Sequence, residues 1–300
     1  MSYPLALHKA EEPIMHEPQL FSVAILSAAL AATGAGAAAQ DTQTLGHAVY
    51  GDGAEKVIVL HDWLGSSITW EPVTPYLDTD RFTFVFVDVR GYGASIDMTG
   101  EYTTEEIAGD IFALADALEF ADFHLIGHSM TGMAGFNAIS TGDGERIQSY
   151  VAVAPTPPSG FPADQETREF FAAIPHAPEV TRSAFDGLTG GRYESTEWAR
   201  LKTERNIDTS SQAAMRGYGA MIYEDLSQRL LDAAPETPVL VIAGPHDLPP
   251  MRPEALEAGI VPLVPNARVV SIDGAGHYPM NETPPRLAQL IQEHLAAHAD

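Results

Sequence analysis

The sequence predicts an α/β fold: a doubly wound, mostly parallel sheet that carries a helical cap insertion. Short runs of apolar and β-branched residues recur along the chain, and segments with helical periodicity separate them. Continuous apolar runs of this length suit strands that are buried on both faces, as in a parallel sheet. Strands that alternate with helices through right-handed crossovers give a doubly wound sheet.

The predicted strands are short, apolar and rich in β-branched residues. They are Lys56–His61, Thr83–Val87, Phe123–Gly127, Tyr150–Ala154, Pro238–Ala243 and Ala267–Ile272. Among the helices, 103–120 opens with a capping box formed by Thr103 and Glu106 and places its apolar side chains on one face. A second amphipathic helix, Pro284–Ala297, follows the last strand.

The connection between Ala154 and Pro238 breaks the alternation, because it contains helical segments but no convincing strand. A structureless loop of this length would argue against the assignment, whereas a helical insertion at the C-terminal edge of the sheet would cover a site there. We therefore expect a core of residues 40–154 and 238–300 and a helical cap of residues 155–237. The expected cap helices are Asp164–Ile174, Glu179–Leu188, Ser195–Asn206 and Ser210–Ala233.

Composition excludes several classes of function. The chain has 41 acidic and 16 basic residues and a formal charge of −25. Such a protein repels nucleic acid and anionic membrane surfaces, so we expect neither as a partner. The chain has no cysteine, which excludes disulfides, cysteine nucleophiles and thiolate metal sites.

The N-terminal residues 1–39 resemble a secretory signal peptide. Leu20–Ala39 is apolar and ends in small residues before Gln40, as in a hydrophobic region followed by a cleavage site. A membrane anchor and a packed helix are the alternatives, although the second half of the segment is rich in alanine and glycine. We expect a secreted or periplasmic protein with no stable membrane partner after cleavage, and a cytoplasmic one if the segment is not a signal.

The stretch GHSMTG, residues 127–132, follows a predicted strand and precedes a small-residue helix. A serine at such a turn is exposed above the sheet, and the backbone N–H of the next residue lies beneath a developing oxyanion. This predicts Ser129 as a nucleophile and the Met130 amide as an oxyanion donor. A helix N-cap is the ordinary alternative for Ser129.

A serine nucleophile needs a base and an acid that orients the base. His277 follows the last predicted strand, and Asp247 follows the one before it, so the chain order is Ser129, Asp247, His277. Each alone is an ordinary loop residue, but three residues at separate strand ends in this order point to a triad. Asp122 lies at the wrong edge of the sheet and Asp273 shares the histidine loop, so Asp247 is the better acid.

The second oxyanion donor is expected from the loop HDWLGSS after the first predicted strand, with the Trp63 amide best placed. We predict no metal or organic cofactor, because the histidines are scattered and no dinucleotide-binding or zinc-protease motif appears. His128 and His246 receive no ligand role.

Over about residues 44–298 the chain resembles the α/β-hydrolase family, through LHDWLGSS, VDVRGYGAS, GHSMTG, IAGPHD and GAGHYPMNETP. It looks most like cofactor-free serine esterases, lactonases and perhydrolase-type members with a helical cap. The resemblance implies the same triad and the same oxyanion amides. Two departures are Asp62 and Thr131, which stand where family members usually have glycine. A carboxylate aimed at the oxyanion would oppose catalysis, and one that points away would be harmless.

We therefore expect a serine hydrolase that cleaves a small-molecule carboxylic ester or lactone through an acyl-enzyme on Ser129. Hydrolysis of a C–C bond and perhydrolysis use the same triad and remain alternatives, as does a binding or sensor protein without turnover. Aromatic residues of the cap are candidates for the pocket, although each is more often cap core. They are Phe170, Phe171, Trp198, Tyr218 and Tyr223.

Overall fold

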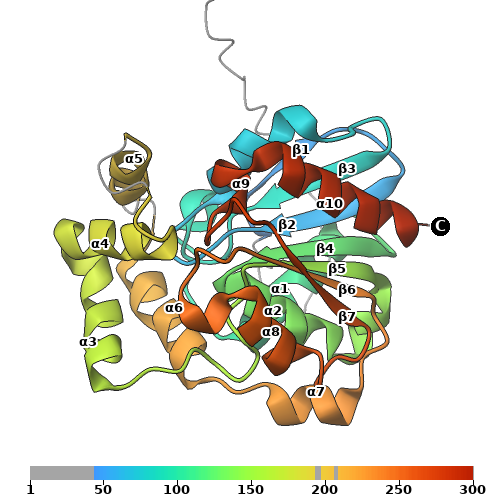
Figure 1. Ribbon diagram of the computed structural model, residues 1–300. Helices are drawn as coiled ribbons and strands as arrows, with labels where there is room; N and C mark the ends of the chain where they lie inside the picture. Colours follow the sequence, from blue (N-terminus) through green and yellow to red (C-terminus); the bar gives the residue numbers. More distant parts are fainter. Residues whose placement is uncertain (1–43, 193–196, 206–208, 300) are drawn as a thin grey trace, which may run out of the picture. The chain divides into compact units, whose positions relative to one another are not determined.

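The computed structural model of the chain describes residues 44–192, 197–205 and 209–299 (Figure 1). The expected signal segment, residues 1–39, lies outside these ranges. In the ranges that are described, no helix is both long and apolar enough to cross a membrane.

A mostly parallel sheet forms the centre of the fold, as the sequence predicts. Within the described ranges it has seven strands in the order β1-β3-β2-β4-β5-β6-β7, and only β1 runs antiparallel to its neighbour. The short edge strand β1 was not predicted, since its side chains are largely exposed and lack an apolar run. The strands are β1 (His47–Tyr50), β2 (Glu55–Leu60), β3 (Phe82–Val87), β4 (Phe123–His128), β5 (Ile147–Val153), β6 (Val239–Ala243) and β7 (Ala267–Ser271).

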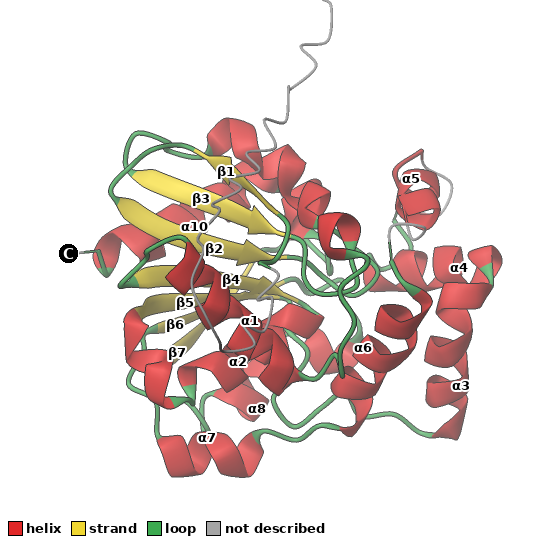
Figure 2. Ribbon diagram, turned by 180° about the vertical axis from the view of Figure 1, so that it is seen from behind, coloured by secondary structure: helices red, strands yellow, loops and turns green. Residues whose placement is uncertain are grey.

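Helices cover both faces of the sheet, which explains why the central strands are apolar throughout (Figure 2). Successive side chains point to opposite faces of a strand. In β2, Ile58 and Leu60 pack in the core cluster that includes α1 and α2, whereas Val57 and Val59 pack in the cluster that includes α10. The helices outside the insertion are α1 (Thr104–Ala117), α2 (Met130–Ile139), α8 (Pro253–Ile260), α9 (Pro279–Glu282) and α10 (Pro284–Ala297).

The start of α1 shows half of the predicted capping box. Thr103 is the N-cap, and its hydroxyl accepts a hydrogen bond from Glu106 N at 3.1 Å. The Glu106 carboxylate accepts instead from Tyr102 N at 2.7 Å. The N–H of Glu106 lies in the first turn and that of Tyr102 just before the helix, where backbone N–H groups have no partner inside the helix.

Helices also fill the described part of the connection between β5 and β6. The single helix expected over 210–233 is wrong, because the chain is extended at Glu224 and forms two helices there. The Glu224 carboxylate accepts hydrogen bonds from the backbone N–H and hydroxyl of Thr104, and this tertiary contact holds the break. These helices are α3 (Gln165–Ala173), α4 (Pro178–Leu188), α5 (Glu197–Arg205), α6 (Ser211–Tyr223) and α7 (Ser227–Ala233). Short 3-10 helices are η1 (Ser67–Tyr76), η2 (Gly93–Ser95), η3 (Gly142–Arg146), η4 (Ile174–His176) and η6 (Pro249–Met251).

Candidate active site

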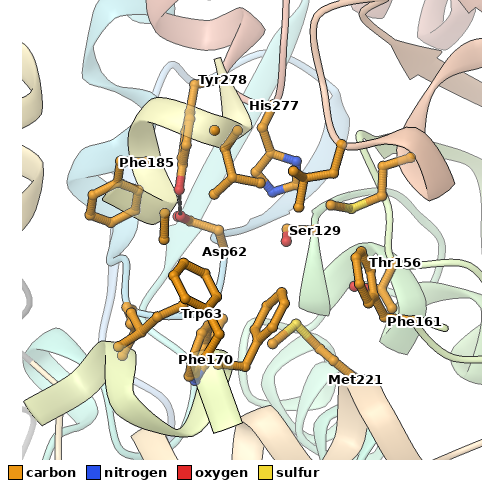
Figure 3. Close-up of a pocket in the computed structure, with 18 of the residues that line it drawn as sticks. Asp62, Trp63, Ser129, Thr156, Phe161, Phe170, Phe185, Met221, His277 and Tyr278 are labelled. Carbon is orange, nitrogen blue, oxygen red and sulfur yellow. Dashed lines mark hydrogen bonds between the residues drawn. The ribbon is translucent and has the colours of Figure 1, made fainter. Parts of the chain in front are cut away.

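Ser129 lies in a strained turn between β4 and α2. Its backbone has φ 58° and ψ −115°, a left-handed conformation that costs a non-glycine residue free energy. Two backbone hydrogen bonds hold the turn: Ser129 N donates to Val153 O at 3.0 Å, and Thr156 N donates to Ser129 O at 3.0 Å. The Ser129 side chain does not cap α2 and faces a cavity instead (Figure 3).

The residues around this turn show why the motif needs glycine at two positions and tolerates threonine at a third. A Cβ on Gly127 would lie 2.6 Å from Thr131 O, and one on Gly132 would lie 2.8 Å from Pro155 Cβ. The Thr131 side chain is buried. Its hydroxyl accepts a hydrogen bond from the backbone N–H of His128 at 3.0 Å and lies 2.9 Å from His61 O. Thr131 therefore links the serine turn to the loop after β2.

His277 and Asp247 form a buried pair at the C-terminal edge of the sheet. His277 Nδ1 lies 2.8 Å from Asp247 Oδ2, and the two side chains are 3% and 0% exposed. The other carboxylate oxygen of Asp247 accepts from Leu248 N at 2.6 Å. The rival acids Asp122 and Asp273 are exposed.

The loop that carries His277 is fixed from several sides. His277 N donates to Leu188 O, at the end of α4, at 2.8 Å. The Glu282 carboxylate accepts from the backbone N–H of Gly276 and of Tyr278 and pairs with Arg192. The ring of His128 packs against that of His277 at an angle of 42°, with ring centroids 5.0 Å apart, and its Nε2 lies 2.8 Å from His277 O. Burial lowers the pKa of His128, so its neutral ring donates to that carbonyl.

The loop after β2 presents a backbone amide near the same place. His61 is buried and holds this loop, since its Nδ1 lies 2.7 Å from Asp62 O and its Nε2 accepts from Val89 N at 3.1 Å. Burial lowers the pKa of His61, in keeping with a neutral ring that donates through Nδ1. Within the part of the chain that the structure describes, the amides of Trp63 and Met130 donate to no protein acceptor.

The Asp62 carboxylate is buried at the edge of the cavity but points away from the candidate serine (Figure 3). It accepts from Tyr278 Oη at 3.1 Å and from Thr69 Oγ1 at 3.2 Å. Lys202 Nζ lies 3.4 Å from one of its oxygens, and His128 Nδ1 lies 3.7 Å from the other. The side chain that replaces the usual glycine is thus held in a polar network.

The cavity beside Ser129 has a volume of about 160 Å³ and is largely apolar. Of the predicted pocket residues, Phe170 and Phe171 line it. Trp198, Tyr218 and Tyr223 do not: Trp198 packs on the Tyr278 ring, Tyr218 packs between aromatic neighbours, and Tyr223 is 64% exposed. Lining residues that the sequence did not single out include Phe161, Ile174, Phe185, Leu188, Met221, Leu248 and Met251.

Several residues that shape this site carry no signal in the sequence. Lys202 reaches Asp62 from a position 140 residues away along the chain, and only folding joins them. Tyr278 and Glu282 lie in the predicted histidine loop, yet neither residue type indicates which backbone or side-chain atom it contacts. His61 precedes the oxyanion loop, but its hydrogen bond to Val89 N depends on the adjacent strand.

Comparisons with known proteins identify the family and support the fold. The family described as alpha/beta hydrolase fold matches residues 55–284. N-formylmaleamate deformylase from Pseudomonas putida is 29% identical over 241 residues, which cover 76% of this chain and 84% of that protein. 3-oxoadipate enol-lactonase 2 from Acinetobacter baylyi is 26% identical over 216 residues, which cover 70% of this chain and 78% of that protein. The enol-lactonase structure from Burkholderia xenovorans LB400 has the same fold, with a TM-score of 0.72, 23% identity, and coverage of 84% and 96%.

Proposed function

The chain belongs to the α/β-hydrolase fold family, and from this premise we propose that it is a serine hydrolase of uncharged carboxylic esters or lactones. Ser129 is the proposed nucleophile, His277 the general base and Asp247 the acid that orients it. The observation that carries the proposal is the buried 2.8 Å contact between His277 Nδ1 and Asp247 Oδ2, beside a strained serine that faces the same cavity.

The proposed reaction has two halves. Because the Asp247 carboxylate accepts a hydrogen bond from the Nδ1–H of His277, Nε2 is unprotonated and can take the Ser129 hydroxyl proton as Oγ bonds to the acyl carbon. The carbonyl oxygen becomes an oxyanion, which accepts from the amides of Trp63 and Met130. The C–O bond to the leaving alcohol then breaks, and the alcohol takes the proton from Nε2. Water next loses a proton to Nε2, attacks the acyl-enzyme and releases the acid, and Ser129 regains its proton.

The lining of the cavity indicates the class of acyl group. Its described residues include many aromatic and aliphatic side chains but no lysine or arginine. Asp62, at its edge, already pairs with Lys202, so this ammonium is not a free partner for a substrate carboxylate. Burying an unpaired carboxylate in such a place costs at least about 3 kcal/mol. An apolar, uncharged acyl group is therefore favoured.

Intact-mass spectrometry with a fluorophosphonate probe tests the nucleophile. We expect one covalent adduct on the wild-type protein and none on the folded S129A variant. An adduct of the same yield on S129A would refute the assignment. Steady product release from an ester supports an enzyme, whereas one stoichiometric burst supports the binding or sensor alternative.

Two esters of one phenol test the substrate class. The butyrate and the hemisuccinate of p-nitrophenol have acyl chains of similar length, but only the hemisuccinate carries a carboxylate. We expect kcat/KM to favour the butyrate by at least about 100-fold, because each factor of ten corresponds to 1.4 kcal/mol. Equal values for the two esters would contradict the reasoning from the cavity lining.

A further inference from the structure

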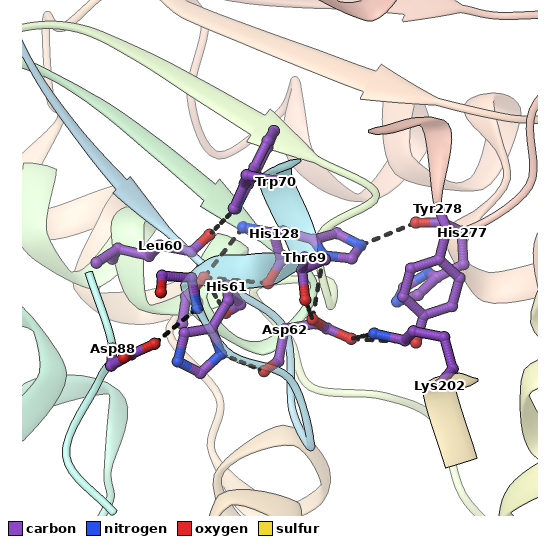
Figure 4. A network of polar contacts seen from close by, with 12 residues as sticks. Leu60, His61, Asp62, Thr69, Trp70, Asp88, His128, Lys202, His277 and Tyr278 are labelled. Atoms are coloured by element: carbon purple, nitrogen blue, oxygen red, sulfur yellow. Dashed lines mark hydrogen bonds and ion pairs between the residues drawn. The ribbon is translucent and has the colours of Figure 1, made fainter. Parts of the chain in front are cut away.

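A buried ion pair joins the insertion to the loop that carries the candidate oxyanion amide. Lys202 lies on α5, and its Nζ is 3.4 Å from Asp62 Oδ2, with side chains 6% and 1% exposed (Figure 4). The same ammonium lies over the rings of Tyr278, at 4.6 Å, and Phe185, at 5.4 Å. A lysine this deeply buried is rare unless its charge is compensated.

The negative charge of Asp62 lies where it can affect the proposed oxyanion site. It immediately precedes Trp63, whose amide is a proposed oxyanion donor, and it lines the cavity that Ser129 faces. A negative charge beside a developing oxyanion would raise the energy of the transition state, strongly so where water is excluded. Although burial raises the pKa of the Asp62 carboxyl, the charge of Lys202 opposes this effect, and the pKa lies well below its usual range. The carboxyl is therefore ionised at neutral pH.

We infer that Lys202 is a positioning residue for catalysis: its ammonium neutralises the Asp62 carboxylate and, with Tyr278 and Thr69, holds it away from the Trp63 amide. The inference rests on the proposed function. It gives α5 a role beyond covering the cavity, since the Asp62 charge beside the oxyanion site is compensated only when Lys202 of this helix contacts the loop after β2.

Substitution at both ends of the pair tests the inference. K202M keeps an unbranched chain of similar length but removes the charge, and we expect kcat on p-nitrophenyl butyrate to fall by about 10- to 100-fold while KM changes by less than about threefold. The K202R control retains the charge and should stay within about threefold of wild type. K202M/D62N removes the uncompensated carboxylate, so its kcat should recover to at least about tenfold above that of K202M.

A purely structural role predicts a different pattern. If Lys202 only anchored α5, K202M would raise KM, and D62N would not rescue kcat in the K202M background. That pattern overturns the positioning role.

Urea unfolding of the wild type, D62N, K202M and the double variant gives a readout that needs no turnover. The double-mutant cycle should show a coupling of at least about threefold in the unfolding equilibrium constant, and an absence of coupling overturns the ion pair itself. If the wild type neither labels nor hydrolyses esters, the proposed function fails and the positioning role fails with it, while the cycle still reports on the ion pair.

Discussion

Removing the Thr131 hydroxyl should destabilise the protein. The hydroxyl is buried and accepts from His128 N at 3.0 Å, and its one proton lies within reach of His61 O at 2.9 Å and His128 O at 3.0 Å. T131V keeps the shape of the side chain but leaves a buried N–H and a buried carbonyl without this partner. Each such loss costs about 1–3 kcal/mol, so we expect a total loss of about 2–4 kcal/mol.

Urea unfolding, followed by circular dichroism, measures this loss. The matched control is T131S, which keeps the hydroxyl and removes one methyl group, at a cost of about 1 kcal/mol. T131G loses the hydroxyl and adds the entropic cost of glycine inside α2, so it should be no more stable than T131V. If T131V were as stable as T131S at an unchanged m value, the argument from the hydroxyl would be wrong.

Two other substitutions test the pH dependence caused by a buried histidine and the close packing of a helix glycine. Burial, with the charges of His298 and Arg268, lowers the pKa of His294 from 6.5 to about 4. As the pH falls below 6.5 the unfolded chain therefore binds a proton first, which favours unfolding by up to about 3 kcal/mol near pH 4. H294F should match the wild type at pH 7.5 and be more stable at pH 4.5 in urea titrations; parallel pH profiles would contradict this. G135A should lose about 1–3 kcal/mol, because the added Cβ overlaps the Tyr150 ring, whereas the control G109A meets no neighbour and should not lose stability. A G135A midpoint equal to that of G109A would show that the ring can move.

The triad was predictable because of the topology of parallel sheets. The C-terminal ends of parallel strands meet at one edge, so a serine, an aspartate and a histidine that each follow a separate strand are brought together. Ser129, Asp247 and His277 satisfy this, and the structure brings His277 and Asp247 into contact and places Ser129 on the same cavity. Their roles in catalysis remain the proposal that the labelling experiment tests.

The sequence predicted the cap less well, for an identifiable reason. Helical periodicity runs through 210–233, yet the chain breaks at Glu224, whose carboxylate binds Thr104 on a distant helix. Aromatic residues were similarly ambiguous. Phe170 on α3 lines the cavity while Tyr223 at the end of α6 is 64% exposed, and the residue type alone does not separate them.

The sequence by itself determined the parallel sheet, the helical content of the insertion and the order of the candidate triad, because each depends on local periodicity and on residues at strand ends. Only the tertiary structure decided the direction of the Asp62 carboxylate. That direction follows from Lys202 and Tyr278, which lie 140 and 216 residues away along the chain. Contacts between such distant positions are made by packing, and no local pattern in the chain records them.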